Sequence, residues 1–244
     1  MNRYLSLTRT HSYSLLFALP LLLIYEVGAV YISRVEGSGL RNGADVLLRM
    51  LLSVGGLQGT AAVTLGVTAT AALLIILERR KKKVPLRFAP FVGMAAESMM
   101  YASVLGLVVG TATQWVLQGM DASIAVGGMS SLSISESLVL SLGAGLYEEL
   151  VFRVLLVGGL YGALKASGLS TAHSGIVSVL ISAVIFSAFH YIGPYGDPLE
   201  LASFTFRFLA GLLFSVLFLT RGFGITAWTH ALYDVMLVFA LAVA

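Results

Sequence analysis

Long apolar stretches alternate with short polar segments along almost the whole chain. An α-helix needs about 20 predominantly apolar residues to cross the hydrocarbon core of a bilayer. Seven stretches reach that length, at 14–33, 58–78, 90–117, 134–163, 173–192, 200–220 and 224–243. The pattern therefore predicts an all-α fold, a polytopic transmembrane helix bundle of about seven spans, with six to eight as the range.

A shorter apolar segment at 44–56 carries Asp45 and Arg49, and it predicts an interfacial or re-entrant helix. Residues 1–33 begin with basic side chains and continue into an apolar run, as a signal peptide does. However, the run is long, Glu26 interrupts it, and no small-residue cleavage site follows it cleanly. A retained first span is therefore favoured, and residues 1–244 are interpreted as a single integral membrane domain.

Composition supports the membrane interpretation and narrows the chemistry. Of the 244 residues, 58% are hydrophobic and 11% are charged, whereas about 25% of residues are charged in soluble domains. The chain has no cysteine, which excludes disulfides, thiolate catalysis and cysteine-ligated metal or iron–sulfur sites. Any chemistry must therefore rest on other side chains.

The basic residues concentrate in one loop. Six of the fifteen lie within positions 78–87, and such a run beside an apolar helix is typical of a cytoplasmic loop. It predicts a cytoplasmic N-terminus and places the loops at 118–133 and 193–199, which contain no Lys or Arg, outside. The exceptions lie near the first span: Arg34, Arg41 and Arg49. No aromatic residues interleave the run, so the expected partner is the lipid bilayer and not nucleic acid.

Ionisable residues inside the last four predicted spans form a short set: Glu148, Glu149, Arg153, His190, Arg207, His230 and Asp234. A charged side chain at the bilayer centre costs about 2.5–3.5 kcal/mol on insertion scales, so such residues are usually paired or functional. Two further acids lie in earlier spans, Glu26 and Glu97. They are compatible either with a substrate or water path or with buried ion pairs to Arg41, Arg49 or another base.

Helix geometry sorts the first of these residues. Glu149 and Arg153 are four positions apart, so they share a helix face and can pair. Glu148 is rotated by about 100° from Glu149 and is not neutralised by the same contact. His230 and Asp234 are also four apart. Spacing alone does not establish that residues from different spans meet.

Glycines at 143, 145, 158, 159 and 162 predict that the fourth span is the closely packed centre of the bundle, because small residues let transmembrane helices approach each other.

The ordered motifs Glu148-Glu149-x-x-x-Arg153, Phe186-x-x-x-His190 and His230-x-x-x-Asp234 resemble those of the CPBP (ABI) family. This family comprises the type II CAAX prenyl endopeptidases and their bacterial relatives, including proteins associated with bacteriocin processing and immunity. The stretch 206–222 also resembles the family's glycine-containing helix, with Ser215 at one expected glycine. The resemblance covers about 134–240, which would be the catalytic core.

The resemblance implies an intramembrane endopeptidase of the glutamate type. Glu148 would activate a water molecule as general base, and His190 would bind and orient that water. His230 and Asp234 would stabilise the oxyanion, while Glu149 and Arg153 would support the site through an ion pair. The resemblance implies no cofactor, a membrane-associated protein or peptide as substrate, and, through its bacterial members, a prokaryotic plasma membrane as location.

Asp234 departs from the family pattern, which often has Asn at this position. An Asn amide donates a hydrogen bond, whereas an ionised Asp only accepts. Either Asp234 is protonated, or it accepts a hydrogen bond from His230 and fixes the tautomer of that ring. The second interpretation is slightly favoured.

Three other functions compete with a glutamate protease. His190, His230 and a glutamate are ligands that catalytic zinc accepts, although no His-Glu-x-x-His motif is present. A non-catalytic membrane scaffold or immunity protein would keep the motifs and act by binding a partner. A proton-coupled transporter would also use buried acids and histidines, but the inverted repeats typical of transporters are not seen.

Overall fold

This computed structural model describes residues 3–35, 37, 39–56, 59–117, 132–193 and 196–243. Within these residues, all regular elements are helices. The helices, in chain order, are α1 (Arg3–Thr8), α2 (His11–Val35), α3 (Gly43–Val54), α4 (Thr60–Lys82), α5 (Ala89–Val116), α6 (Ile134–Gly143), η2 (Ala144–Val157), α7 (Gly158–Ala166), α8 (Thr171–Phe189), α9 (Leu201–Arg221) and α10 (Phe223–Val243). The predicted all-α class is confirmed.

Six of these helices, α2, α4, α5, α8, α9 and α10, are long and apolar enough to cross a membrane. They correspond to six of the seven predicted spans. The remaining predicted span, 134–163, is a succession of α6, η2 and α7, and the expected short helix at 44–56 is α3. The predicted loop at 118–133 lies almost wholly outside the described residues.

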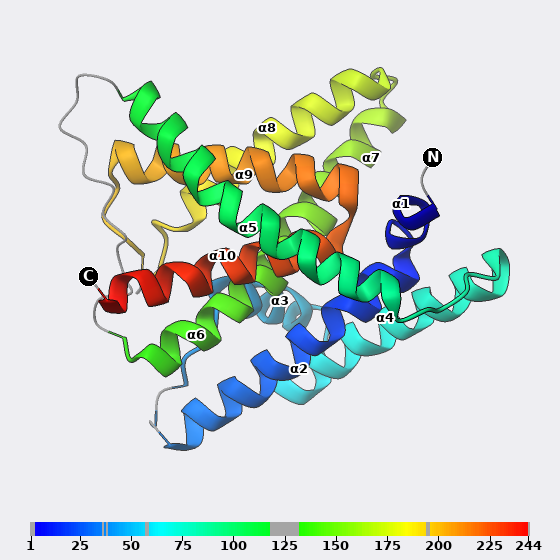
Figure 1. The fold of residues 1–244 in the computed structure, drawn as a ribbon, viewed down its shortest axis with the longest axis horizontal. Helices are drawn as coiled ribbons and strands as arrows, with labels where there is room; N and C mark the ends of the chain where they lie inside the picture. Colours follow the sequence, from blue (N-terminus) through cyan, green and yellow to red (C-terminus); the bar gives the residue numbers. More distant parts are fainter. Residues whose placement is uncertain are drawn as a thin grey trace.

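The helices surround a central one. In Figure 1, α10 crosses the middle of the molecule, with α8 and α9 above it and α2 and α4 below. The main hydrophobic core gathers η2 with side chains from α2, α3, α8 and α10. The start of α1 and the end of α10 lie at opposite ends of the bundle (Figure 1).

Segment η2 is a π-helix, in which each backbone N–H bonds to the carbonyl five residues earlier, and such segments often mark functional sites. Gly145 lets it approach α10 closely: a Cβ atom at Gly145 would lie 2.5 Å from the carbonyl oxygen of Ala227. Gly143 is also buried, against Tyr25. The close packing predicted for these two glycines is confirmed.

The same prediction is wrong for the three later glycines of the segment, which are exposed: Gly158, Gly159 and Gly162. Close packing therefore ends with η2, and the glycines of α7 do not serve it.

The acids of the early spans form partly buried ion pairs. Glu26 contacts Arg41 at 3.1 Å and Arg49 at 3.0 Å, and Glu97 contacts Arg221 at 2.5 Å. The pairing alternative for both acids is thus confirmed, and it explains how they are tolerated among apolar helices.

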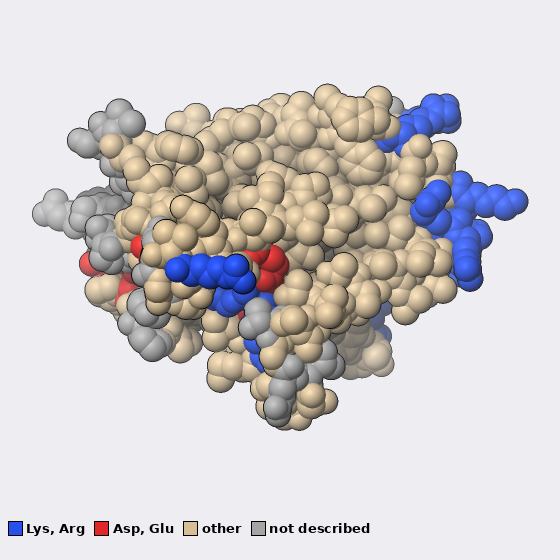
Figure 2. All heavy atoms as spheres, turned by 90° about the horizontal axis from the view of Figure 1, so that it is seen from below, with Lys and Arg blue, Asp and Glu red and all other residues tan. Residues whose placement is uncertain are grey.

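A large group of Lys and Arg side chains lies at one end of the molecule in Figure 2, the end where α4 stops and α1 begins in Figure 1, and a second group lies beside acidic side chains nearer the middle. The run at positions 79–83 and Arg87 accounts for much of the large group, and these side chains are exposed. The charge asymmetry that the sequence predicts along the chain is therefore also an asymmetry in space.

Candidate active site

Three charged side chains of η2 point into the protein. Glu148, Glu149 and Arg153 are 6%, 0% and 0% exposed. Charges removed from water need a partner, because the desolvation of a carboxylate or guanidinium is costly. The contacts of these three side chains therefore define the chemistry at the centre of the bundle.

The two oxygens of Glu148 have different surroundings. Oε1 accepts a hydrogen bond of 2.9 Å from the side-chain amide of Asn42. Oε2 is buried without a hydrogen-bond partner among the described residues. It faces Nε2 of His190 at 3.9 Å and Nε2 of His230 at 4.0 Å, both beyond hydrogen-bond length.

His190 is the C-cap residue of α8. Its Nδ1 lies 2.8 Å from the carbonyl oxygen of Phe186, one helical turn earlier. Because a carbonyl only accepts, Nδ1 carries the hydrogen, and Nε2 of the neutral ring is left as an acceptor facing Glu148. The spacing Phe186-x-x-x-His190 thus has a direct structural purpose.

His230, on α10, lies between carboxylates. Its Nδ1 bonds to Oε1 of Glu149 at 2.7 Å, and its Nε2 lies 3.5 Å from Oδ2 of Asp234. The ring also stacks on Phe214, with 4.4 Å between ring centres. The contact that orients His230 therefore comes from Glu149. Asp234 lies on the side of the ring that faces Glu148, which corrects the expectation that Asp234 fixes the tautomer.

Arg153 forms the ion pair expected with Glu149, with 3.2 Å between NH1 and Oε1. Its guanidinium also lies over the ring of Phe186, 4.2 Å from the ring centre. A cation desolvated against an aromatic face gains about 2 kcal/mol or more. Arg153 therefore contacts both Glu149, which bonds to His230, and Phe186, whose carbonyl oxygen bonds to His190.

Asn42 is the residue that the sequence interpretation missed. It is the N-cap of α3, where its side-chain oxygen accepts from the backbone N–H of Ala44. An Asn just before an amphipathic helix is a recognisable cap signal. Nothing in the local sequence indicates that the amide of this cap also reaches Glu148.

The position of Asn42 is fixed by a polar network at the start of α3. Its backbone N–H donates to the hydroxyl of Tyr25 at 3.2 Å, and that hydroxyl donates to Asp45 at 2.8 Å. Arg41 bridges Asp45 and Glu26. Burial alone would lower the pKa of Arg41, but its hydrogen bonds to the two carboxylates outweigh this effect and raise it. The guanidinium thus stays charged and holds the network together.

Arg207, on α9, pairs with Asp197, which follows the site histidine in the chain. The backbone N–H of Asp197 bonds to the carbonyl oxygen of His190 at 3.0 Å. Arg207 therefore anchors the segment after α8, and it forms no hydrogen bond or ion pair with Glu148.

Within the described ranges, no group of three or more His, Asp and Glu side chains is arranged to hold a metal ion. The six residues to which the resemblance gives a role nevertheless lie in one cluster built by η2, α8 and α10: Glu148, Glu149, Arg153, His190, His230 and Asp234.

Residues 130–236 match the sequence model of a known family, described as type II CAAX prenyl endopeptidase Rce1-like. This matched segment contains all six residues of the cluster, whereas Asn42 lies outside it. Comparison with curated proteins and with solved structures gives no significant match. Residues 130–236 are thus similar to the type II CAAX prenyl endopeptidases, which supports a likeness of this part of the chain to the CAAX protease-like family.

Proposed function

We propose that the protein hydrolyses a peptide bond of a membrane-associated protein or peptide, with a water molecule activated by Glu148. The observation that carries this proposal is the convergence of three side-chain atoms from three helices. Oε2 of Glu148 lies 3.9 Å and 4.0 Å from Nε2 of His190 and Nε2 of His230. Such gaps between polar groups suit a bridging water.

In this mechanism the bridging water donates one hydrogen to Nε2 of His190 and the other to Oε2 of Glu148. Asn42 holds Oε1, so Oε2 is the oxygen that takes the proton. The water oxygen attacks the carbonyl carbon of the substrate as its proton passes to Glu148. When the C–N bond breaks, Glu148 returns that proton to the leaving amine, which closes the general acid–base cycle.

His230 stabilises the oxyanion of the tetrahedral intermediate. Its Nδ1–H is directed at Glu149, so Nε2 donates when the ring is an imidazolium, whose charge Glu149 and Asp234 balance. One fixed donor at a developing oxyanion contributes about 2.7–4 kcal/mol of barrier lowering. Asp234 acts through His230, because an ionised carboxylate itself repels an oxyanion.

Glu149 and Arg153 act as positioning residues in this scheme. Glu149 orients the His230 ring, and Arg153 supplies the positive charge that accompanies a buried carboxylate. Removal of one partner from a buried ion pair costs about 3–5 kcal/mol, so both residues serve the fold and the site together.

The membrane setting belongs to the same proposal. The cluster of cations at one end of the bundle (Figure 2) favours a cytoplasmic position for that end and for the N-terminus. The bacterial branch of the family favours a prokaryotic plasma membrane. Substrates would then enter from the bilayer, in which the exposed apolar flanks of the helices lie.

The test uses the full chain in liposomes with a library of lipid-anchored and transmembrane peptides, and mass spectrometry detects new peptide termini. Glu148→Gln should abolish cleavage, since it removes the base but keeps the side-chain shape. Asp234→Asn should retain substantial activity, because it replaces a residue that acts through His230 with a hydrogen-bond donor. Equal losses in both variants would contradict these roles, and cleavage by Glu148→Gln would favour a different base.

A further inference from the structure

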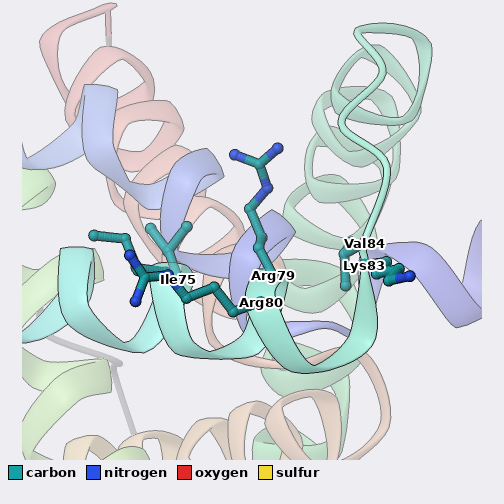
Figure 3. Close-up of a pocket in the computed structure, with 6 residues that line it drawn as sticks. Ile75, Arg79, Arg80, Lys83 and Val84 are labelled. Atoms are coloured by element: carbon teal, nitrogen blue, oxygen red, sulfur yellow. The ribbon is translucent and has the colours of Figure 1, made fainter.

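An open pocket of about 400 Å³ lies at the end of α4, and it shares no residue with the Glu148 cluster. Arg79 and Arg80 project from the last turns of the helix, and Lys83 belongs to the turn that follows (Figure 3). The other lining side chains are apolar: Ile75, Ile76 and Val84. The pocket therefore combines three positive charges with an apolar wall.

The positive charges of this pocket are not neutralised by the nearest acid. Glu78 is turned into the protein, 7% exposed, and accepts hydrogen bonds of 2.7 Å and 2.8 Å from the backbone and hydroxyl of Ser12. It also forms an ion pair with Lys82, at 3.1 Å. No ion pair joins an acid of the described residues to Arg79, Arg80 or Lys83. A ligand that brings negative charge would therefore meet three uncompensated cations.

The backbone brings the three cations to the lining of the same pocket, although their side chains point in different directions in Figure 3. Lys83, the C-cap of α4, has φ of 49°, a left-handed conformation that is uncommon for a residue with a side chain. The chain turns back at this point, so that Val84 is buried at 7% exposure while Lys83 stays exposed. Lys83 consequently lies beside the pocket with Arg79 and Arg80.

Helix α4 is the most peripheral of the candidate spans, with 11% of its apolar window buried. Its exposed apolar side chains continue away from the cations along the helix: Leu65, Leu73, Leu74, Ile76 and Leu77. In a bilayer such a flank lies against acyl chains, while the basic end lies at the depth of the headgroups. The order of apolar wall and cations matches the order of tail and headgroup in a lipid.

We propose that this pocket binds the headgroup phosphate of an anionic phospholipid, with the first carbons of an acyl chain on Ile75 and Ile76. Clusters of basic residues next to a membrane helix attract anionic lipids. The positive-inside pattern requires only that the loop be basic. A saturable site with an apolar wall goes beyond that pattern and makes different predictions.

The test measures the binding of fluorescent phosphatidylglycerol to the full chain in a neutral detergent. Arg79→Gln/Lys83→Gln removes two charges from the pocket. The matched control, Lys81→Gln/Arg87→Gln, removes two exposed charges of the same run outside the pocket lining. The pocket variant should bind about thirtyfold more weakly, which corresponds to about 2 kcal/mol for two cations, and the control should change less than threefold.

Both variants change exposed side chains, so their unfolding temperatures should match the wild-type value and confirm an intact fold. Phosphatidylcholine, which has the same phosphate but no net charge, should bind much more weakly. Equal losses of lipid affinity in the two variants would show that general surface charge attracts the lipid, and this result would refute the proposed site. Displacement of the lipid by inorganic phosphate at similar concentration would assign the pocket to free phosphate instead.

Discussion

Asn42→Ser gives the sharpest test of how Glu148 is positioned. In the wild type, Asn42 donates to Oε1 of Glu148 at 2.9 Å and caps α3 through its side-chain oxygen. Serine is an equally good N-cap residue, but its side chain is shorter and has no amide. The substitution therefore removes the hydrogen bond to Glu148 and keeps the cap.

The magnitude follows from the charge of the acceptor. A hydrogen bond to a charged group is worth about 1.5–3 kcal/mol, and Asn42 is 8% exposed, so water does not readily replace it. If this energy holds Glu148 in its reactive orientation, kcat should fall by about 10- to 150-fold, since each 1.36 kcal/mol is a factor of ten in rate. KM should change little, because Asn42 contacts the base and not the proposed substrate position.

The assay combines initial cleavage rates in liposomes with thermal unfolding of the same preparation. Asn42→Ala should lose as much activity as Asn42→Ser and, in addition, about 1 kcal/mol of stability from the missing cap. Ser133→Ala is the matched control, because it removes the cap of α6 and should lower stability without changing kcat. If the Asn42→Ser variant is fully folded and keeps the wild-type kcat, the positioning role of Asn42 is refuted.

Two further predictions concern the packing of η2 and the chemistry of the site. Gly145→Ala should destabilise the protein by about 1–3 kcal/mol, because the new Cβ would lie 2.5 Å from the carbonyl oxygen of Ala227. Thermal unfolding measures this loss of stability. In the control Gly159→Ala the added Cβ meets nothing within 4 Å, so stability should hardly change. Chelator treatment should leave cleavage within twofold of the untreated rate, because the proposed steps use only protein side chains and water; loss of activity that zinc restores would instead assign the site to zinc.

The spans could be predicted because long apolar runs carry the information for a transmembrane helix within themselves. The Glu149–Arg153 pair was predictable for a similar reason, since its spacing of four is local and its 3.2 Å contact confirms it. Both predictions depend only on the residues of a single helix.

Contacts between distant helices were not predictable in this way. Asn42 reaches Glu148 across 106 positions, and Glu149 reaches His230 across 81. Each depends on how α3 and α10 pack against η2, which no periodicity encodes. The π conformation of η2 also has no signal in its apolar sequence, and the exposed Gly158 and Gly159 show that glycine content alone does not locate a packed surface.

The two adjacent glutamates are more closely linked than their helix spacing suggests. An α-helix would turn Glu148 and Glu149 about 100° apart, which favours separate tasks, one chemical and one structural. In the structure both carboxylates face the same imidazole: Glu149 at Nδ1, 2.7 Å away, and Glu148 at Nε2, 4.0 Å away. The π-helix carries both residues, and close contact at Gly145 brings α10 to it. Glu149 thereby reaches the proposed reaction through His230, and the pair acts as one unit around that ring.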